Sequence, residues 1–213
     1  MKITFYGHAS LGIEVSGKHI LVDPYISANP QANHIGINTL KADFILLTHA
    51  HGDHILDVEA IAKRTNAVIV SNAEIAGYYA KKGFQTHPMN HGGSWNFDFG
   101  KVKYVSAIHS SSLPDGNYGG NPGGFVIEGE HKNIYIAGDT ALTMDMKLIP
   151  MRTKLDLAIF PMVIISPWIS MTPLSLRTLW NVIKFSEFIT IPLVTSKSIT
   201  RKPSRNFSTK GKI

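Results

Sequence analysis

The sequence predicts an α+β fold in which sheets pack as a sandwich and helices flank them. Short apolar runs recur along residues 1–162, and Gly, Pro, Asp or Asn bound most of them, as is typical of strands. A few segments instead space their apolar residues as an amphipathic helix does. Because strands dominate, helices are interspersed and no internal repeat is present, packed sheets with helices outside are favoured.

Residues 1–83 contain predicted strands with helices between them. Pro24 cannot continue a central strand, so the third strand should end at Asp23. Apolar residues have helical spacing over 55–65, and Gly83 closes a second helix predicted over Ala73–Lys82. The strands predicted here are Ile3–Tyr6, Leu11–Val15, His19–Val22, Phe44–Thr48 and Ala67–Val70.

The strands predicted after residue 100 are more widely separated along the chain. Lys101–Ile108 alternates apolar and polar residues and stops at His109. Gly123–Glu128 and Asn133–Ala137 are joined by a predicted hairpin turn at 129–132. Leu155–Pro161 is the last run of this kind, so the sandwich is expected to be complete within residues 1–161.

Size and composition favour one soluble domain in the cytoplasm. The chain has 213 residues and 44% hydrophobic content, which suits a single core. It has no cysteine, which excludes disulfides and thiolate zinc sites and favours a reducing cytosol. The N-terminus lacks the apolar stretch of a signal peptide. The most apolar segment, 155–169, contains Asp156, Pro161 and Pro167 and is too short to span a bilayer.

The net charge of +6 comes from the C-terminal part of the chain alone. Residues 163–213 hold eight Lys or Arg residues and one acid, Glu187, whereas residues 1–162 hold thirteen basic and fourteen acidic residues. A basic chain raises the hypothesis of nucleic-acid binding. Because the rest of the chain is nearly neutral, the excess charge belongs to the tail and needs a separate explanation.

The segment His49–His54 places three imidazoles and one carboxylate within six residues. It follows the buried strand predicted over Phe44–Thr48, so the side chains project from the turn after that strand. Alternation along extended backbone puts His49 and His51 on one side. Gly52 permits a tight bend toward a neighbouring position. Imidazole nitrogen and carboxylate oxygen are zinc ligands, so this turn predicts a metal site rather than a His-rich surface turn.

Two further strand ends carry metal-competent side chains. His109 follows Lys101–Ile108, and Asp139 follows Asn133–Ala137. Alone, His109 fits a ligand or an ordinary polar residue equally well. Asp139 alone would more often be a turn residue or a helix N-cap. Both repeat the arrangement of a donor directly after an apolar strand, which favours a shared metal site.

These motifs resemble the metallo-β-lactamase superfamily in His49–His54, His109 and Gly138-Asp139-Thr140. Within it, four more segments resemble a family of cytoplasmic metal-dependent hydrolases that is similar to the ascorbate-phosphate lactonase branch. The resemblance covers about residues 1–162 and implies a four-layer αββα sandwich with a dinuclear site at the sheet edges. The four segments are Tyr6–Ser10, Val22–Pro24, Met89–Gly93 and His109–Ser111.

The resemblance also implies roles for individual residues. His49, His51 and His109 would bind the first metal, Asp53 and His54 the second, and Asp139 would bridge the two. Three other residues would contact substrate or support the ligands: His8, Asp23 and His91. His87 and His131 have no matching role and are expected at the surface.

The expected chemistry follows from two divalent metal ions. A metal lowers the pKa of bound water, so that hydroxide is available at neutral pH, and it polarises the scissile carbonyl or phosphoryl group. Asp53 is the expected catalytic residue, which orients this nucleophile and moves its proton. Zinc is the first expectation for these donors, while manganese or iron would accept the same set.

From about residue 162 the chain departs from the resemblance. The superfamily places one more His on a late loop, whereas no His follows His131 here. The related family would continue after Pro161 with a segment like Ile-Gly-Asp-x-x-Thr-Met, whereas this chain continues Met162-Val163-Ile164-Ile165. The change coincides with the shift to basic composition, so residues 162–213 are predicted to be a divergent basic tail outside the 1–161 hydrolase domain.

A one-base deletion near the codon of Met162 would explain this departure. Met and Trp have single codons, so four junctions read in the shifted frame are fixed. Met162/Val163 encodes Gly, Trp168/Ile169 and Met171/Thr172 encode Asp, and Trp180/Asn181 encodes Glu. These are the glycine and acids that the resemblance implies there. The tail is therefore predicted to be out of frame and non-native, and a divergent tail that binds an acidic partner is the alternative.

The function predicted is a metal-dependent hydrolase that cleaves an ester, lactone, amide or phosphodiester bond in a small molecule. The alternative is an impaired or non-catalytic metal-binding protein of the same fold, because the last metal-ligand His is absent. Nucleic-acid processing depends only on the tail charge and is the weakest hypothesis, so no specific nucleic-acid or membrane partner is expected. The bulk properties do not indicate a substrate or an oligomeric state.

Overall fold

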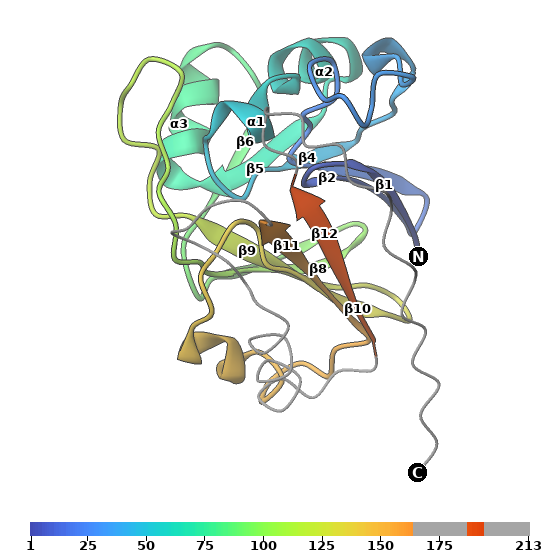
Figure 1. The fold of residues 1–213 in the computed structure, drawn as a ribbon, viewed down its shortest axis with the longest axis vertical. Coiled ribbons are helices and arrows are strands. Elements are labelled where there is room, and N and C mark those ends of the chain that lie inside the picture. Colours follow the sequence, from blue (N-terminus) through green and yellow to red (C-terminus); the bar gives the residue numbers. More distant parts are fainter. Residues whose placement is uncertain (164–186, 194–213) are drawn as a thin grey trace.

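Two six-stranded sheets pack face to face in the computed structural model, which describes residues 1–163 and 187–193 (Figure 1). The first sheet has the strand order β1-β2-β3-β4-β5-β6. The second has the order β12-β11-β10-β9-β8-β7. The predicted sandwich of sheets is therefore confirmed.

The first sheet is antiparallel at one end and parallel through its centre. β1 pairs with β2 and β2 with β3 in antiparallel register, while β3, β4, β5 and β6 pair in parallel. Antiparallel neighbours need only tight turns, whereas parallel ones need the longer crossovers that carry the helices. Its strands are β1 (Lys2–Gly7), β2 (Ser10–Val15), β3 (Lys18–Val22), β4 (Phe44–Leu46), β5 (Val68–Asn72) and β6 (Thr86–Met89).

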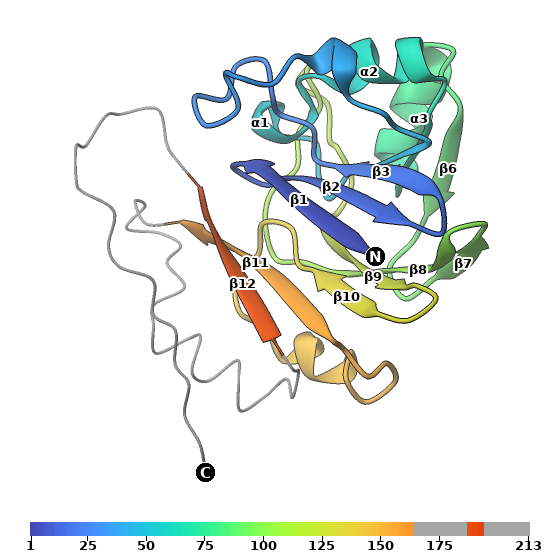
Figure 2. The same cartoon turned by 90° about the vertical axis from the view of Figure 1, so that its right-hand side faces the viewer.

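The second sheet is a meander that ends in parallel strands. β7, β8, β9 and β10 pair antiparallel in sequence order, and β11 pairs in parallel with both β10 and β12. Figure 2 shows β11 and β12 at one side of the sandwich. The strands are β7 (Ser94–Phe97), β8 (Gly100–Ser106), β9 (Gly123–Glu128), β10 (Asn133–Ile136), β11 (Leu157–Val163) and β12 (Glu187–Leu193).

The helices cover the outer face of the first sheet (Figure 1). They are α1 (Gly52–Ile55), α2 (Val58–Thr65) and α3 (Ala73–Lys81), with a short 3-10 helix η1 (Ile37–Thr39). Asn72 caps α3, because its side chain accepts a hydrogen bond from the Ile75 amide. Among the described residues, the 3-10 helix η2 (Met144–Leu148) lies outside the second sheet.

Three apolar layers hold these elements together. The central one lies between the sheets, where Leu11 and Val22 of the first sheet meet Tyr104 and Phe125 of the second. A second layer packs the helices on the first sheet, and a third packs η2 on the outer face of the second sheet. Strands buried on both faces in this way appear in the sequence as continuous apolar runs, which explains why they were predictable.

Strand direction brings several strand ends to one edge of the sandwich. In the first sheet, β1, β3 and β4 run in the same direction, because two antiparallel pairings separate β1 from β3 and a parallel one joins β3 to β4. In the second sheet, β8 and β10 share a direction, since both pair antiparallel with β9. Predicted site residues follow each of these strands: His8 after β1, Asp23 after β3, His49 after β4, His109 after β8 and Asp139 after β10.

The structure differs from the predicted elements in a few places. The helix predicted over 55–65 is divided into α1 and α2, because Asp57 leaves helical geometry and its carboxylate accepts hydrogen bonds from the Ile26 and Ser27 amides. The short strands β6 and β7 were not predicted, and neither was η2. β6 contains Pro88, which is tolerated because β6 is an edge strand.

The predicted boundary at residue 161 falls inside β11, which continues to Val163. β12 belongs to the predicted tail and pairs with β11 from Leu157↔Glu187 to Val163↔Leu193. The rest of the tail, 164–186 and 194–213, lies outside the described residues, so the out-of-frame hypothesis stays a prediction. Within the described part of the chain, no helix has the length and apolar character needed to cross a membrane.

Candidate metal centre

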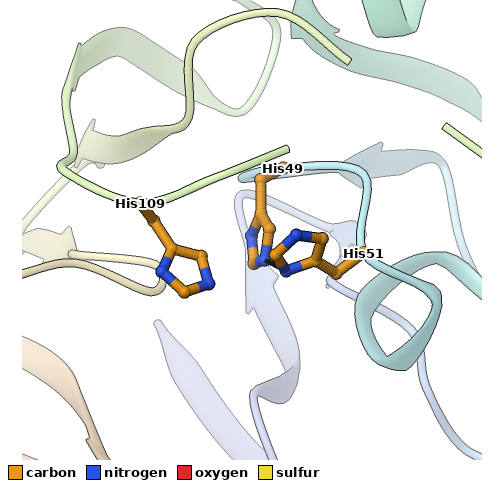
Figure 3. A group of neighbouring side chains, drawn as sticks. All are labelled: His49, His51 and His109. Atoms are coloured by element: carbon orange, nitrogen blue, oxygen red, sulfur yellow. Dashed lines mark hydrogen bonds between the residues drawn. The ribbon is translucent and has the colours of Figure 1, made fainter. Parts of the chain in front are cut away.

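Three histidines from two sheets meet at the shared edge. His49 and His51 follow β4, and His109 follows β8 (Figure 3). Their candidate ligand atoms all lie within 4.8 Å of one another. The closest pair is His49 Nε2 and His51 Nδ1, which are 3.0 Å apart. Side chains separated along the sequence by more than 50 residues therefore form one compact donor group.

Hydroxyl groups occupy the other nitrogen of two of these rings. Thr48 Oγ1 lies 3.0 Å from His49 Nδ1, and Ser110 Oγ lies 3.2 Å from His51 Nε2. His49 Nε2 and His51 Nδ1 are left to face each other. A hydrogen bond to one nitrogen of a ligating histidine fixes its tautomer and orientation, so this arrangement suits a metal held between the facing nitrogens.

A second group of donors lies beside the first. His54 Nε2 is 3.5 Å from Asp139 Oδ2, which is also 3.7 Å from His109 Nε2. The carboxylate of Asp139 thus faces histidines of both groups, as expected of a bridging ligand. Asp53 Oδ2 lies 3.1 Å from His8 Nε2, and the donor atoms of His8, Asp53 and His54 are all within 4.8 Å of one another.

Asp23 contacts His54 directly and, through Thr48, it is linked to His49. Its carboxylate accepts hydrogen bonds from the Thr48 amide and the Thr48 hydroxyl, at 2.8 and 2.7 Å. The same carboxylate lies 3.0 Å from His54 Nδ1. Asp23 is 1% exposed and His54 fully buried, so this pair is removed from water and directs His54 Nε2 toward the cluster.

Burial sets the protonation of the first group. Removal from water lowers the pKa of His49, His51 and His109, and neighbouring imidazoles lower that of His49 further. Neutral imidazole is the form that binds metal. Burial also lowers the pKa of His54, but the carboxylates of Asp139 and Asp23 outweigh it and raise the pKa to about 10.

Unpaired buried atoms test whether this site fits a metal. His54 Nε2, His8 Nε2 and Asp139 Oδ1 are buried and have no hydrogen-bond partner among the described residues. Buried polar atoms are nearly always paired, so three such atoms in one cluster point to a bound species in addition to the described side chains. A divalent cation satisfies imidazole nitrogen and carboxylate oxygen together, so the residues present fit the predicted metal.

The structure brings together the predicted site residues with one exception. His91 joins neither donor group; its Nε2 donates to the Pro122 carbonyl at 2.9 Å, and its ring packs on Tyr104. His131 is exposed, as predicted. His87 was also expected at the surface, but it is half-buried against the rings of Trp95 and Phe97.

Sequence reasoning missed the hydroxyl groups that position the ligands. Thr48 and Ser110 each stand next to a predicted ligand, which was the available signal. Thr140 Oγ1 accepts a hydrogen bond from the Ile108 amide at 2.9 Å, and it thereby ties the loop of Asp139 to the loop of His109. The Ser110–His51 and Thr140–Ile108 contacts join loops from different strands, so spacing along the chain does not reveal them.

The two-sheet sandwich and its His/Asp cluster define a metal-binding protein of the β-lactamase superfamily type. The model of the Beta-lactamase superfamily domain matches residues 18–185. A UPF0173 metal-dependent hydrolase of Flavobacterium johnsoniae is 85% identical over 161 residues, which are 76% of this chain and 72% of the relative. The chain belongs to this family of metal-dependent hydrolases within the β-lactamase superfamily.

More distant comparisons agree with this assignment. A UPF0173 metal-dependent hydrolase of Methylacidiphilum infernorum is 51% identical over 162 residues, again 76% of this chain and 72% of the relative. The solved structure of Igni18, a metallo hydrolase from Ignicoccus hospitalis, superimposes with a TM-score of 0.75 at 29% identity. That superposition covers 90% of this chain and 81% of Igni18.

Proposed function

We propose that residues 1–161 hydrolyse a small molecule at a dinuclear site, by cleavage of an ester, lactone, amide or phosphodiester bond. One observation carries the proposal: His49, His51 and His109 converge within 4.8 Å while hydroxyls occupy the opposite nitrogens of two of the rings. A second set of donors, Asp53, His54 and Asp139, lies alongside. A divalent metal, with zinc the first choice for these donors, supplies an activated water and a Lewis acid when bound.

The protein residues have separate tasks in this proposal. The three histidines of the first group, together with Asp53, His54 and Asp139, would hold the metals. Asp23 and Thr48 keep two ring tautomers fixed, because their hydrogen bonds occupy the nitrogens that face away from the cluster. Positions held in this way need no rearrangement during reaction, which lowers the barrier.

Asp53 is the proposed proton carrier. Its side chain is half exposed, unlike those of the other carboxylates of the cluster, and it therefore reaches both the metal-facing side and solvent. The neighbouring His8 imidazole lowers the pKa of Asp53 well below its ordinary range, so the carboxylate is ionised at neutral pH. With a metal bound, the ionised carboxylate would orient the reacting water and accept its proton as a general base.

An impaired protein of the same fold is the second candidate. It is motivated by the share of each matched relative that this chain leaves unaligned. The aligned stretches in two relatives are 161 and 162 residues long, and they cover 72% of each relative. The remaining 28% of each relative and the remaining 24% of this chain are unaligned, while the superfamily model matches this chain as far as residue 185. We propose that the tail is out of frame, that its positive charge is accidental, and that the second metal is held less tightly than the first.

Metal dependence of turnover tests the proposed hydrolase. Ester, lactone and phosphodiester reporters should be cleaved by the full chain, lose turnover with EDTA and regain it with zinc or manganese. His109→Ala should abolish the reaction, and His131→Ala, which removes an exposed histidine, should not. Tight metal binding without turnover of any reporter would instead support the impaired protein.

Sequencing of the gene and intact mass of the native protein test the reading frame. A frame that is continuous across the Met162 codon, with the mass of all 213 residues, would refute the deletion. DNA or RNA binding that weakens with salt and disappears on truncation after Pro161 would indicate attraction to the tail charge rather than nucleic-acid processing.

A further inference from the structure

We infer that His8 is a protein ligand of the second metal, in addition to Asp53, His54 and Asp139. The inference rests on the dinuclear site proposed above. It gives His8 a different role from the substrate contact or supporting role expected from the sequence. The inference rests on the positions of three donor atoms: the unpaired nitrogens His8 Nε2 and His54 Nε2, and the carboxylate of the half-exposed Asp53.

Without His8 the second site has three donors, Asp53, His54 and Asp139, and it lacks the late-loop His that the resemblance implies, because no His follows His131. Structural and catalytic zinc sites use three or four protein ligands, and donor atoms bonded to zinc at 2.0–2.2 Å are about 3.4 Å apart in tetrahedral geometry. His8 Nε2 and Asp53 Oδ2 are 3.1 Å apart, and His54 Nε2 and Asp139 Oδ2 are 3.5 Å apart. Each separation is close to that distance, and the donor atoms of His8, Asp53 and His54 all lie within 4.8 Å of one another.

The His8 ring is buried but its Nε2 is not satisfied. His8 is 6% exposed, and its Nε2 has no aligned hydrogen-bond partner among the described residues although Asp53 is close. The ring packs edge-on against Tyr25 and His54, with centroids 5.4 and 5.2 Å away. A nitrogen that is enclosed, unpaired and adjacent to two metal-competent donors is suited to binding an ion.

The backbone holds His8 in this position independently of the ring. His8 lies in the turn after β1 with φ of 55°, a left-handed conformation that non-glycine residues rarely adopt. Gly7 precedes it with φ of 106°, and a Cβ there would approach the Gln31 Cβ to 2.6 Å. The Gln31 side chain accepts a hydrogen bond from the His8 amide at 2.8 Å. Strained residues of this kind are often retained at functional sites.

The rival explanation is that His8 only orients Asp53. In that case its ring would bond to the carboxylate and never to the metal. Heteronuclear NMR separates the two, with the full chain labelled with ¹⁵N-histidine and titrated with ¹¹³Cd²⁺. We expect ¹¹³Cd–¹⁵N coupling at His49, His51 and His109 with the first equivalent, and at His8 and His54 with the second.

Each outcome of the titration is decisive. Coupling at the first-group histidines without coupling at His8 at saturation would overturn this inference and leave the proposed function intact. No coupling at any of these histidines would overturn both. Coupling at His8 would establish it as a ligand, because an orienting residue has no bond to the cadmium.

Metal stoichiometry of variants provides a second test. His8→Gln keeps the side-chain size and the backbone contact to Gln31, and it should weaken binding of the second zinc equivalent at least about 10-fold while the first is unchanged. His87→Ala is the matched control, since it removes a half-buried stacked histidine outside the cluster. Unchanged affinity for both equivalents in folded His8→Gln would contradict the inference, and the labelled wild type decides if that variant does not fold.

Discussion

Thr48 and Asp23 are joined by two hydrogen bonds, one from the Thr48 amide and one from its hydroxyl, at 2.8 and 2.7 Å. The hydroxyl also lies 3.0 Å from His49, and the Asp23 carboxylate lies 3.0 Å from His54. One buried pair therefore connects a histidine of the first donor group with a histidine of the second. Changes to either partner should affect metal binding as well as stability.

Asp23→Asn is expected to destabilise the metal-free protein by roughly 2 kcal/mol, the size of a lost charge-assisted hydrogen bond. Asparagine tolerates the left-handed backbone at this position, where φ is 45°, so the effect reports the lost charge rather than strain. Urea unfolding of the metal-free variant and wild type measures this difference in the free energy of unfolding. Asp43→Asn is the control: Asp43 accepts a hydrogen bond from the His19 amide away from the cluster, so it should change stability without changing zinc affinity.

Thr48→Val is expected to lower zinc affinity of the first site about 10- to 100-fold, as loss of a group that orients a ligating histidine does elsewhere. Valine keeps the shape but cannot fix the tautomer of His49. Competition with a chromogenic chelator measures the affinity. Thr65→Val removes a comparable hydroxyl from α2, where it donates to the Ile61 carbonyl, and should leave affinity unchanged. Equal affinities in both variants would contradict the role of Thr48.

Stability of the metal-free protein should fall as pH rises above neutrality. The pKa of His54 is about 10 in the folded protein, against about 6.5 in unfolded chains. A raised folded pKa contributes stability that is fully present below pH 6.5 and is lost as the pH approaches 10. Unfolding midpoints from pH 6 to 10 measure it, and His54→Gln should flatten the dependence. A midpoint that rises over this range would contradict the assignment.

Zinc binding should release the His54 proton near pH 8, because the metal takes the nitrogen that carries it. Calorimetry in buffers of different ionisation enthalpy counts the protons released.

Zinc binding should also raise the melting temperature, since a ligand at 1,000 times its Kd stabilises the folded state by about 4 kcal/mol. EDTA should reverse the shift, and a melting temperature indifferent to zinc and EDTA would argue against a preformed site.

The local part of the site was predictable from the sequence. His49, His51, Asp53 and His54 lie within six residues, so their proximity is set by the turn that contains them. Buried strands were visible as apolar runs, and the fold class followed from their order. Edge strands such as β6 and β7 were missed because Pro88 and several exposed residues break the apolar pattern.

Tertiary structure alone decided how distant donors meet. The sequence by itself determined the ligand types and their positions after strands, because these depend on neighbouring residues. It did not determine that β1, β3 and β4 run in one direction, which places His8 and Asp23 beside His54. Pairing between strands sets direction and order through backbone hydrogen bonds, which are the same for every side chain. The orphaned nitrogen of His8 is therefore a property of the assembled sheets and not of the motif.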